Sequence, residues 1–400
     1  GNTGSSMIDN WGTLTIKSGD YSGGLDVVKS EPGATLLITG GTFALNHAVA
    51  WSYTGVVLSY GDLTITGGTF NQNATTPAKA YPTVVVTAKD KVDDPTPHTK
   101  ITGGVFNNAH SSSSAKIFHP MSKATSDNFE VSGGTFNKSI SDGYCADGFI
   151  PTKNADGTYG VKEGKYVVKV GSTGYETFDG AIDAANKSSN SKTIKLLEDL
   201  TVDHRIVIKN VRGKAITLDL GGYTLTNSYG GGGYSLLTHT AVTMKNGTYK
   251  STKGSARGIG AVADFTLENA TLSAAGLVGL GCSATDATYT VKNSTVIGNY
   301  ALANFANNAT INIIESSTIT GSGVGIYHNG SNSGLQLTAT GSTITAAATG
   351  ATNGIYVSGS TDTMAAAGAQ QVTLTNCTVS GGTAVEVKYT DLTLTDCTVT

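Results

Sequence analysis

The sequence predicts an all-β fold, a parallel β-helix in which short coils stack along one axis to form a solenoid. The first observation is an internal repeat in the second half. There a small residue, a threonine and an apolar residue recur every 20 to 35 residues, mostly every 23 to 25. A unit of this length cannot bury its own apolar face and must stack on its neighbours. The recurring threonines are Thr224, Thr248, Thr271, Thr295, Thr318, Thr343, Thr378 and Thr398.

The second observation is a related repeat in the first half of the chain. Gly-Gly-Thr-Phe occurs at residues 40–43, 67–70 and 133–136, and Gly-Gly-Val-Phe occurs at residues 103–106. This is the same succession of a small residue, a polar or β-branched residue and an apolar residue. We therefore expect the first half to be built of stacked coils as well.

Composition is the third observation. The 400 residues include 52 Gly but 7 Pro, and 14% are charged, which favours many short strands joined by tight turns over disorder. With a net charge of −3 and no basic stripe, nucleic acid is not an expected partner. No apolar run reaches the ~20 residues of a membrane span, so we expect no membrane insertion. The chain opens and stops inside repeat-like segments, and we read it as part of a longer protein.

Alignment of the second-half repeats gives columns with a physical meaning. The residue after each threonine is nearly always aliphatic, which predicts an inward core column, and the threonine itself should face outward. The residue two before each threonine is mostly Gly or Asn, and both tolerate a left-handed backbone, so each coil should turn a corner there. The core column comprises Leu225, Leu272, Val296, Ile319, Ile344 and Val379.

A second column predicts another strand in each coil, at a small residue followed by an aliphatic one. Insertions such as residues 329–334 and 358–368 vary in length between the strands, as loops on the outside of a solenoid can. Leucine-rich repeats would show more Leu per unit, and propellers would need about twice this period. The second column comprises Gly258-Ile259, Gly276-Leu277, Ala301-Leu302, Gly325-Ile326, Gly354-Ile355 and Ala384-Val385.

One segment departs from the repeat. Residues 177–187 predict a short amphipathic helix, with Thr177 as its cap and with Phe178, Ala181, Ile182 and Ala185 on one face. Such a helix can cover the exposed apolar end of a solenoid. We therefore expect two β-helical domains in tandem, 1–162 with the Gly-Gly-Thr-Phe repeats and 163–400 with the helix and coils of about 23–24 residues.

A further signal is carried by six segments, residues 133–137, 144–151, 154–161, 175–185, 194–197 and 216–225. Together they resemble a junction found in large cell-surface proteins of Gram-positive, mainly gut-dwelling bacteria. The resemblance covers most of the chain and implies a right-handed parallel β-helix similar to the pectate-lyase-like superfamily. It also implies an extracellular location, secreted or attached to the cell wall, and a role as an adhesin or surface stalk.

The resembled superfamily includes polysaccharide lyases and glycosidases, which need acidic side chains clustered on one outer face. The polygalacturonase-like pattern of Asn-Thr-Asp, Asp-Asp, Gly-His-Gly and Arg-Ile-Lys on successive coils is not found in this sequence. The nearest fragments are His328-Asn329-Gly330 and Arg205-Ile206-Val207, and neither has carboxylates at coil spacing. Asp219 and the Asp203-His204-Arg205 segment favour structural or solvated roles. We therefore predict no catalytic residue.

We also predict no metal ion or cofactor. Asp90, Asp93 and Asp94 form an acidic loop that could offer oxygen ligands to Ca²⁺, but two lysines intervene and a solvated loop is favoured. The seven histidines show no zinc-like spacing. Cys377 and Cys397 share a column on adjacent coils, within reach of a disulfide, yet that column otherwise holds small residues and favours free thiols.

Aromatic residues supply the candidate binding site. Tyr327 and Tyr356 follow the aliphatic residue of the second column and should point outward and stack, while other aromatics lie in loops. Exposed aromatic rings bind sugars or proteins through flat apolar contact with a polar tip, although tyrosine also simply suits strands. The candidate binding residues are Tyr327, Tyr356, His328, Tyr229, Tyr234, Trp51 and Tyr53.

The expected function is a non-catalytic extracellular module, a monomeric stalk or adhesin that binds a host glycan or a host surface protein. The alternative is a polysaccharide lyase or glycoside hydrolase of the β-helical type. Ice binding is a weaker alternative, because outward threonine columns suit it but coils of uneven length count against it.

Overall fold

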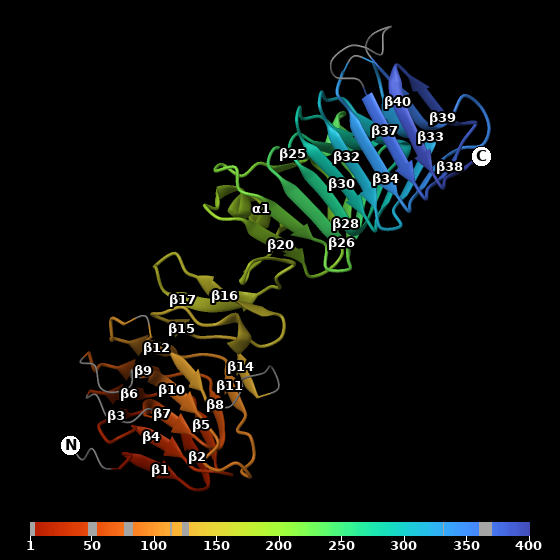
Figure 1. Cartoon of the computed structure of the whole chain (residues 1–400). Helices are drawn as coiled ribbons and strands as arrows, with labels where there is room; N and C mark the ends of the chain where they lie inside the picture. The colour runs from red at the N-terminus through yellow and green to blue at the C-terminus, as the bar shows by residue number, and fades with distance from the viewer. Residues whose placement is uncertain are drawn as a thin grey trace. The chain divides into compact units, whose positions relative to one another are not determined.

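The computed structural model describes residues 5–46, 54–75, 83–112, 114–121, 128–330, 332–359 and 370–400. It is an all-β parallel solenoid of the right-handed type with about 15 turns, and 53% of these described residues are in strands and 4% in helix. The predicted fold class is therefore confirmed. Contacts divide the chain into a first unit, Gly1–Lys165, and a second unit, Tyr166–Thr400 (Figure 1).

The first unit has three sheets of parallel strands, one on each side of the coil. The first sheet contains β1 (Ile8–Asn10), β4 (Val28–Ser30), β7 (Gly55–Ser59), β10 (Thr83–Thr87) and β13 (Phe118–Pro120). The second contains β2 (Thr13–Ile16), β5 (Thr35–Ile38), β8 (Asp62–Ile65), β11 (Thr99–Ile101) and β14 (Phe129–Val131). The third contains β3 (Asp20–Ser22), β6 (Thr42–Leu45), β9 (Thr69–Gln72), β12 (Val105–Asn108) and β15 (Thr135–Phe136).

An antiparallel hairpin ends the third sheet. β17 (Tyr159–Glu163) pairs with β15 and with β16 (Phe149–Lys153), in both cases antiparallel. A single turn of 3₁₀ helix, η1 (Asp142–Tyr144), precedes the hairpin. The switch from parallel to antiparallel pairing occupies the edge that β15 would otherwise leave open.

The Gly-Gly-Thr-Phe motif combines two backbone requirements with one core residue. The second glycine has a left-handed backbone in every copy, with φ of 104° at Gly41, 103° at Gly68, 106° at Gly104 and 108° at Gly134. At the first glycine a Cβ atom would meet the preceding coil, because the backbone oxygen of Thr39 would lie 2.4 Å from a Cβ at Gly67. Glycine is required at both positions, for conformation at one and for close approach at the other.

The phenylalanines of these motifs form a stacked row inside the first unit. The ring centroids of Phe43 and Phe70 are 4.9 Å apart, and those of Phe70 and Phe106 are also 4.9 Å apart. All three rings are fully buried. Phe136 continues the row at 5.5 Å with a tilt. The motif thus places one aromatic ring per coil in the core.

The second unit opens with an antiparallel pair, β18 (Val168–Val170) and β19 (Thr173–Tyr175), followed by α1 (Phe178–Lys187). The Thr177 hydroxyl accepts a hydrogen bond of 3.2 Å from the Gly180 amide, which caps the helix. Phe178, Ala181, Ile182 and Ala185 are buried in the core of the unit, as predicted. In the described part of the chain no helix is long and apolar enough to cross a membrane.

Three ladders of parallel strands form the second unit, and four long strands turn a corner and so belong to two ladders. Ladder 1 contains β20 (Lys192–Leu196), β23 (Ile216–Asp219), β26 (Val242–Ser251), β28 (Phe265–Ala274), β30 (Thr288–Lys292), β32 (Thr310–Ile314), β34 (Gln336–Thr340), β37 (Gln370–Thr375) and β40 (Thr390–Thr395). Ladder 2 contains β21 (Leu200–Val202), β24 (Thr224–Asn227), β26, β28, β31 (Thr295–Asn304), β33 (Thr318–His328), β35 (Thr343–Ala346), β38 (Thr378–Ser380) and β41 (Thr398–Val399). Ladder 3 contains β22 (Ile206–Ile208), β25 (Tyr234–Thr238), β27 (Arg257–Ala261), β29 (Val278–Cys282), β31, β33, β36 (Asn353–Ser358) and β39 (Thr383–Lys388).

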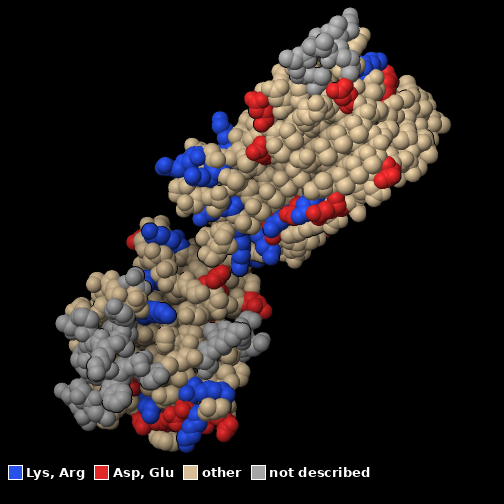
Figure 2. All heavy atoms as spheres, in the orientation of Figure 1, with Lys and Arg blue, Asp and Glu red and all other residues tan. Residues whose placement is uncertain are grey.

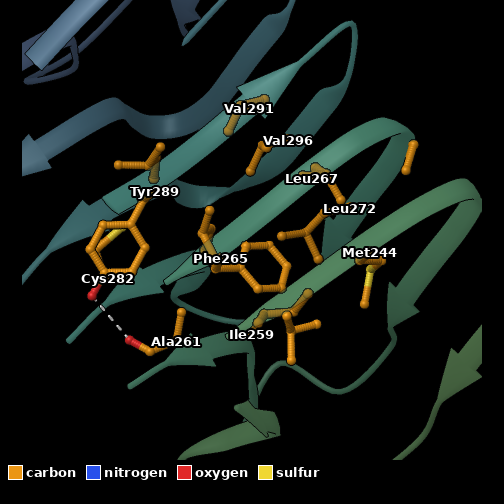
Figure 3. Close-up of a cluster of buried hydrophobic side chains, with 14 of the residues drawn as sticks. Met244, Ile259, Ala261, Phe265, Leu267, Leu272, Cys282, Tyr289, Val291 and Val296 are labelled. Carbon is orange, nitrogen blue, oxygen red and sulfur yellow. Dashed lines mark hydrogen bonds between the residues drawn. The ribbon is translucent and has the colours of Figure 1, made fainter. Parts of the chain in front are cut away.

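The corners and the core column of the second unit are as predicted. Every residue two before a repeat threonine has a positive φ, including 58° at Asn246, 50° at Asn269 and 59° at Gly341. The six residues of the predicted core column, from Leu225 to Val379, are fully buried. Figure 3 shows Leu267, Leu272, Val291 and Val296 pointing into this interior.

One pair of the second column is wrong. The predicted Gly276-Leu277 pair is not in the core, because Leu277 is 47% exposed and precedes β29. Gly279 and Leu280 take that place, and Leu280 pairs with Ile259 and Leu302 on the neighbouring coils. The small-then-aliphatic pattern occurs twice within five residues here, so the pattern alone cannot fix the register.

The outer face of ladder 1 repeats its residues from coil to coil. One column alternates in charge along Lys195, Asp219, Lys245, Glu268 and Lys292, and the Lys292 amine lies 3.0 Å from Glu268. In Figures 1 and 2 the face that carries β30, β32, β34 and β37 has few charged side chains. A second column comprises Thr193, Thr217, Thr243, Thr266, Thr290, Asn312, Thr338, Thr373 and Thr393.

The contrast between adjacent residues in β33 gives a test of the inward and outward assignment. Ile319→Asp places an unpaired charge between two coils, so we expect it to lower the free energy of unfolding of the second unit by about 4 kcal/mol or more. Thr318→Asp, at a half-exposed position, should cost about 1 kcal/mol or less. Urea unfolding and hydrogen exchange measure both. Equal loss of protection in the two variants would show that the assignment is wrong.

The first glycine of the repeat motif gives a second test, in the first unit. Gly67→Ala forces a Cβ against the Thr39 carbonyl oxygen, so we expect a loss of about 1–3 kcal/mol in the unfolding free energy of that unit. The control is Gly12→Ala, since a Cβ at Gly12 meets nothing within 4 Å and should be neutral or slightly stabilising. If the two variants unfold at the same denaturant concentration, close coil contact does not explain the motif.

Candidate binding surface

Ladder 3 carries the candidate site on its outer face. Its strand register aligns one outward column along the coils, and in that column Tyr327 and Tyr356 are paired neighbours. Both rings are half-exposed, as predicted for outward tyrosines. The column comprises Leu237, Gly260, Gly281, Ala303, Tyr327, Tyr356 and Glu386.

Three tyrosine rings stack along the solenoid axis on this face. The centroids of Tyr300 and Tyr327 are 4.8 Å apart, and those of Tyr327 and Tyr356 are 5.6 Å apart, with planes within 15° of parallel. Phe305 lies against Tyr327 at 6.5 Å. We call Tyr234, Tyr300, Phe305, Tyr327 and Tyr356 the tyrosine face.

The stacking changes how a ligand can meet these rings. Both faces of Tyr327 are covered by neighbouring tyrosines, and Tyr356 has Tyr327 on one side and the Lys388 amine 5.3 Å from its ring centroid. The flat contact between sugar and ring expected from the sequence is therefore not offered by the middle of the stack. What the row presents to solvent is ring edges and phenol hydroxyl groups, which both donate and accept hydrogen bonds.

Tyr234 extends the face toward the earlier coils, and two glycines make room for it. A Cβ at Gly260 would lie 2.6 Å from the Tyr234 ring, and one at Gly281 would lie 2.0 Å from its hydroxyl oxygen. The ring therefore lies close against the backbone of β27 and β29. Only glycine at both positions leaves space for this arrangement.

Two arginines lie beside the tyrosines at this end of the face. The guanidinium of Arg257 is 5.4 Å from the ring centroid of Tyr234, its partner in the strand register. The guanidinium of Arg205 is 5.2 Å from the ring centroid of Tyr229. Cations at this distance are attracted to an aromatic ring. Of the predicted binding residues, Tyr229, Tyr234, Tyr327 and Tyr356 are thus all on or next to this face.

His328 does not belong to the surface. Its imidazole is fully buried, because the side chain after outward Tyr327 points into the coil. Its Nδ1 lies 2.9 Å from the amide nitrogen of Asn304 on the adjacent coil. Burial lowers the pKa of His328 to about 4, so the ring is neutral at pH 7.

Trp51 and Tyr53 lie outside the described residues. Tyr60, which follows them in the sequence, is half-buried, and the Lys29 amine lies 5.5 Å from its ring centroid. Burial raises the pKa of Tyr60. The first unit also has a cavity of about 500 Å³ beside Phe118, Lys138 and Tyr144.

Asp203 and His204 contact each other, and His204 contacts the start of α1. His204 Nε2 lies 2.9 Å from Asp179 in the first turn of α1, and Nδ1 lies 3.3 Å from Asp203. The bond to Asp179, followed by that to Asp203, raises the pKa of His204. The described residues contain no group of three His, Cys, Asp or Glu side chains placed to hold a metal ion. Cys377 and Cys397 are free thiols.

The arginines and Phe305 were missed in the sequence, although one signal was present. Tyr234, Arg257 and Tyr300 all occupy the position immediately before the small residue of the second column, which is the start of the ladder 3 strand.

No protein-family model matches the chain, and no curated protein is significantly similar to it.

The burial of His328 predicts a pH dependence of stability. Since the folded pKa is below the ordinary 6.5, the unfolded chain binds the proton more readily, and stability present above pH 6.5 is lost as the pH falls toward 4. We expect this histidine to contribute a loss of up to about 1.4 kcal/mol per pH unit in that interval. Urea unfolding of the second unit at several pH values measures it.

The comparison variant is His328→Gln, which lacks the titrating ring and should show a flatter pH profile. The control is His239→Gln, at an exposed histidine of the same unit, which should keep the wild-type slope. Identical slopes in all three proteins would contradict the assignment.

Proposed function

We propose that the chain is a non-catalytic, extracellular β-helical module of a bacterial surface protein, a stalk or adhesin that binds a host glycan or host protein through the tyrosine face. The observation that carries the proposal is the continuous row of Tyr300, Tyr327 and Tyr356 on a rigid sheet. Tyrosine offers large contact area and a polar tip at a low entropic cost, which is why binding surfaces use it.

The dimensions of the face favour an elongated ligand. From β25, which carries Tyr234, to β39, which carries Lys388, ladder 3 passes through seven strands. At ~4.8 Å per coil the six steps span roughly 30 Å. An extended oligosaccharide or peptide running along the axis would meet the hydroxyl groups of Tyr300, Tyr327 and Tyr356 on three successive coils. The location outside the cell rests on the resemblance to Gram-positive surface proteins, and a monomer is the simplest state for such a module.

The main rival is a polysaccharide lyase or glycoside hydrolase. Glu386 is the carboxylate of the outward column, and it lies 2.9 Å from the Lys388 amine and 3.0 Å from the Asn353 amide nitrogen. The bonds to Lys388 and Asn353 lower the pKa of Glu386. A carboxyl group held ionised in this way is a poor general acid, which a glycosidase requires. Cleavage of polygalacturonate or of host glycans by the purified chain would favour the rival.

A glycan array combined with a host-protein pull-down identifies the ligand, and tyrosine variants test the face. We expect Tyr327→Thr and Tyr356→Thr each to weaken binding of that ligand by about tenfold or more, because each removes a ring edge and a phenol hydroxyl from the row. Threonine keeps the strand propensity, so the loss of unfolding free energy should be limited to the ring contacts, about 0.5–1.5 kcal/mol per stacked pair.

The control is Tyr223→Thr, at an exposed tyrosine of the turn before β24, which should leave the affinity unchanged. Retention of full affinity by both Tyr327→Thr and Tyr356→Thr would place the binding site elsewhere.

A further inference from the structure

We propose that the ligand of the tyrosine face is anionic, and that the pair Arg205 and Arg257 binds its carboxylate or sulfate groups. This inference rests on the proposed glycan-binding function and adds a charge to the ligand. Both arginines contact the same residue, Tyr234, one through its ring and the other through its carbonyl oxygen. The two guanidinium groups therefore lie at one end of the tyrosine face.

The position of Arg205 is set by the glycine-rich loop before β25. Its Nε donates to the Tyr234 carbonyl oxygen at 3.1 Å, and its Nη2 donates to the Gly232 carbonyl oxygen at 2.8 Å and to the Tyr229 hydroxyl at 3.0 Å. A Cβ at Gly233 would lie 3.0 Å from Nη2, so the loop is shaped around this side chain. Arg205 remains exposed although its nitrogens are fixed, and a fixed guanidinium loses little entropy on binding.

The position of Arg257 is fixed by the strand register. It begins β27, directly beside Tyr234 on β25, and is half-buried against that ring. Among the described residues no carboxylate forms an ion pair with Arg205 or Arg257. Asp203, the acid nearest to Arg205 in sequence, is bound to His204. The two positive charges are thus left for a ligand.

Arginine is rare in this chain, and most of it lies beside the tyrosine face. The sequence contains three arginines against 23 lysines, and two of the three arginines are stacked on tyrosines at this place. Arginine stacks on aromatic rings and has five N–H donors, so the Nη1 group of Arg205 and the guanidinium of Arg257 can still donate to a carboxylate or sulfate. Hydrogen bonds that hold the glycine-rich loop would account for the presence of Arg205. They do not account for Arg257, whose described contact is the Tyr234 ring.

The chemistry that fits is an acidic glycan. Its anionic group would lie at Arg205 and Arg257, and its uncharged hydroxyl-bearing stretch would follow the hydroxyl row of Tyr300, Tyr327 and Tyr356 along the axis. At the far end the Lys388 amine adds a further positive charge, although it is shared with Glu386. A host protein would satisfy the tyrosines but would need acidic side chains at the same spot.

The experiment compares neutral and charged glycans of the same backbone. Probes are dextran against dextran sulfate, and methyl-esterified pectin against polygalacturonate, measured by calorimetry at low and at high salt. We expect the acidic member of at least one pair to bind about tenfold or more tightly, and its affinity to fall with salt. The dextran pair tests recognition of sulfate groups, and the pectin pair tests recognition of carboxylate groups.

Two arginine variants then test which side chain binds the anionic group of the ligand. Arg257→Gln should weaken binding of the acidic glycan by about tenfold and binding of the neutral glycan by much less, without altering the loop that Arg205 holds. Arg212→Gln is the matched control, because Arg212 is the third arginine and lies in the exposed turn between β22 and β23. It should bind like the wild type.

The outcomes separate this inference from the function on which it rests. If neutral and acidic glycans bind equally well and Arg257→Gln has no effect, the anionic ligand is excluded while glycan binding stands. If Arg212→Gln weakens binding as much as Arg257→Gln does, the charge effect is general and the arginine pair is not a site. If none of the glycans binds, glycan recognition and this inference both fail.

Discussion

The parallel backbone ladder between successive coils is the constraint from which the rest of the structure follows. Coils that pair in register lie ~4.8 Å apart, and where one backbone passes over another more closely than this there is no room for a Cβ atom. The first glycine of each Gly-Gly-Thr-Phe motif marks such a place in the first unit. In the second unit the left-handed Asn and Gly corners let each coil change direction without losing the ladder.

Pairing in register also places each residue in a column with the equivalent residues of the neighbouring coils. Repetition of a lysine would stack equal charges, and the second unit instead alternates Lys195, Asp219 and Lys245 along one column. Repetition of an aromatic residue is favourable, because the coil spacing is close to the distance at which rings stack. Two rows of rings stack at this spacing. One is the tyrosine face on the outside of the second unit, and the other is the row of Phe43, Phe70 and Phe106 inside the first unit.

The columns were readable in the sequence because they depend on local chemistry. The left-handed corners, the core from Leu225 to Val379 and the α1 helix could be predicted from residue type and spacing. The buried leucine of the next coil could not be predicted, because Gly276-Leu277 and Gly279-Leu280 both fit the pattern. Only the pairing of Leu280 with Ile259 and Leu302 shows which of the two is in the core. The arginine pair was also hidden, because Arg205 reaches Tyr229 and Tyr234 from a coil 24 or more residues away.

The direction of the interstrand hydrogen bonds has a mechanical consequence for the second unit. They run parallel to the solenoid axis, so tension between its two ends would strip the outermost coil first and move inward one coil at a time. Each released coil of about 24 residues supplies roughly 80 Å of extended chain in place of ~4.8 Å of stacked height. A solenoid built this way is expected to lengthen stepwise under load, one coil after another.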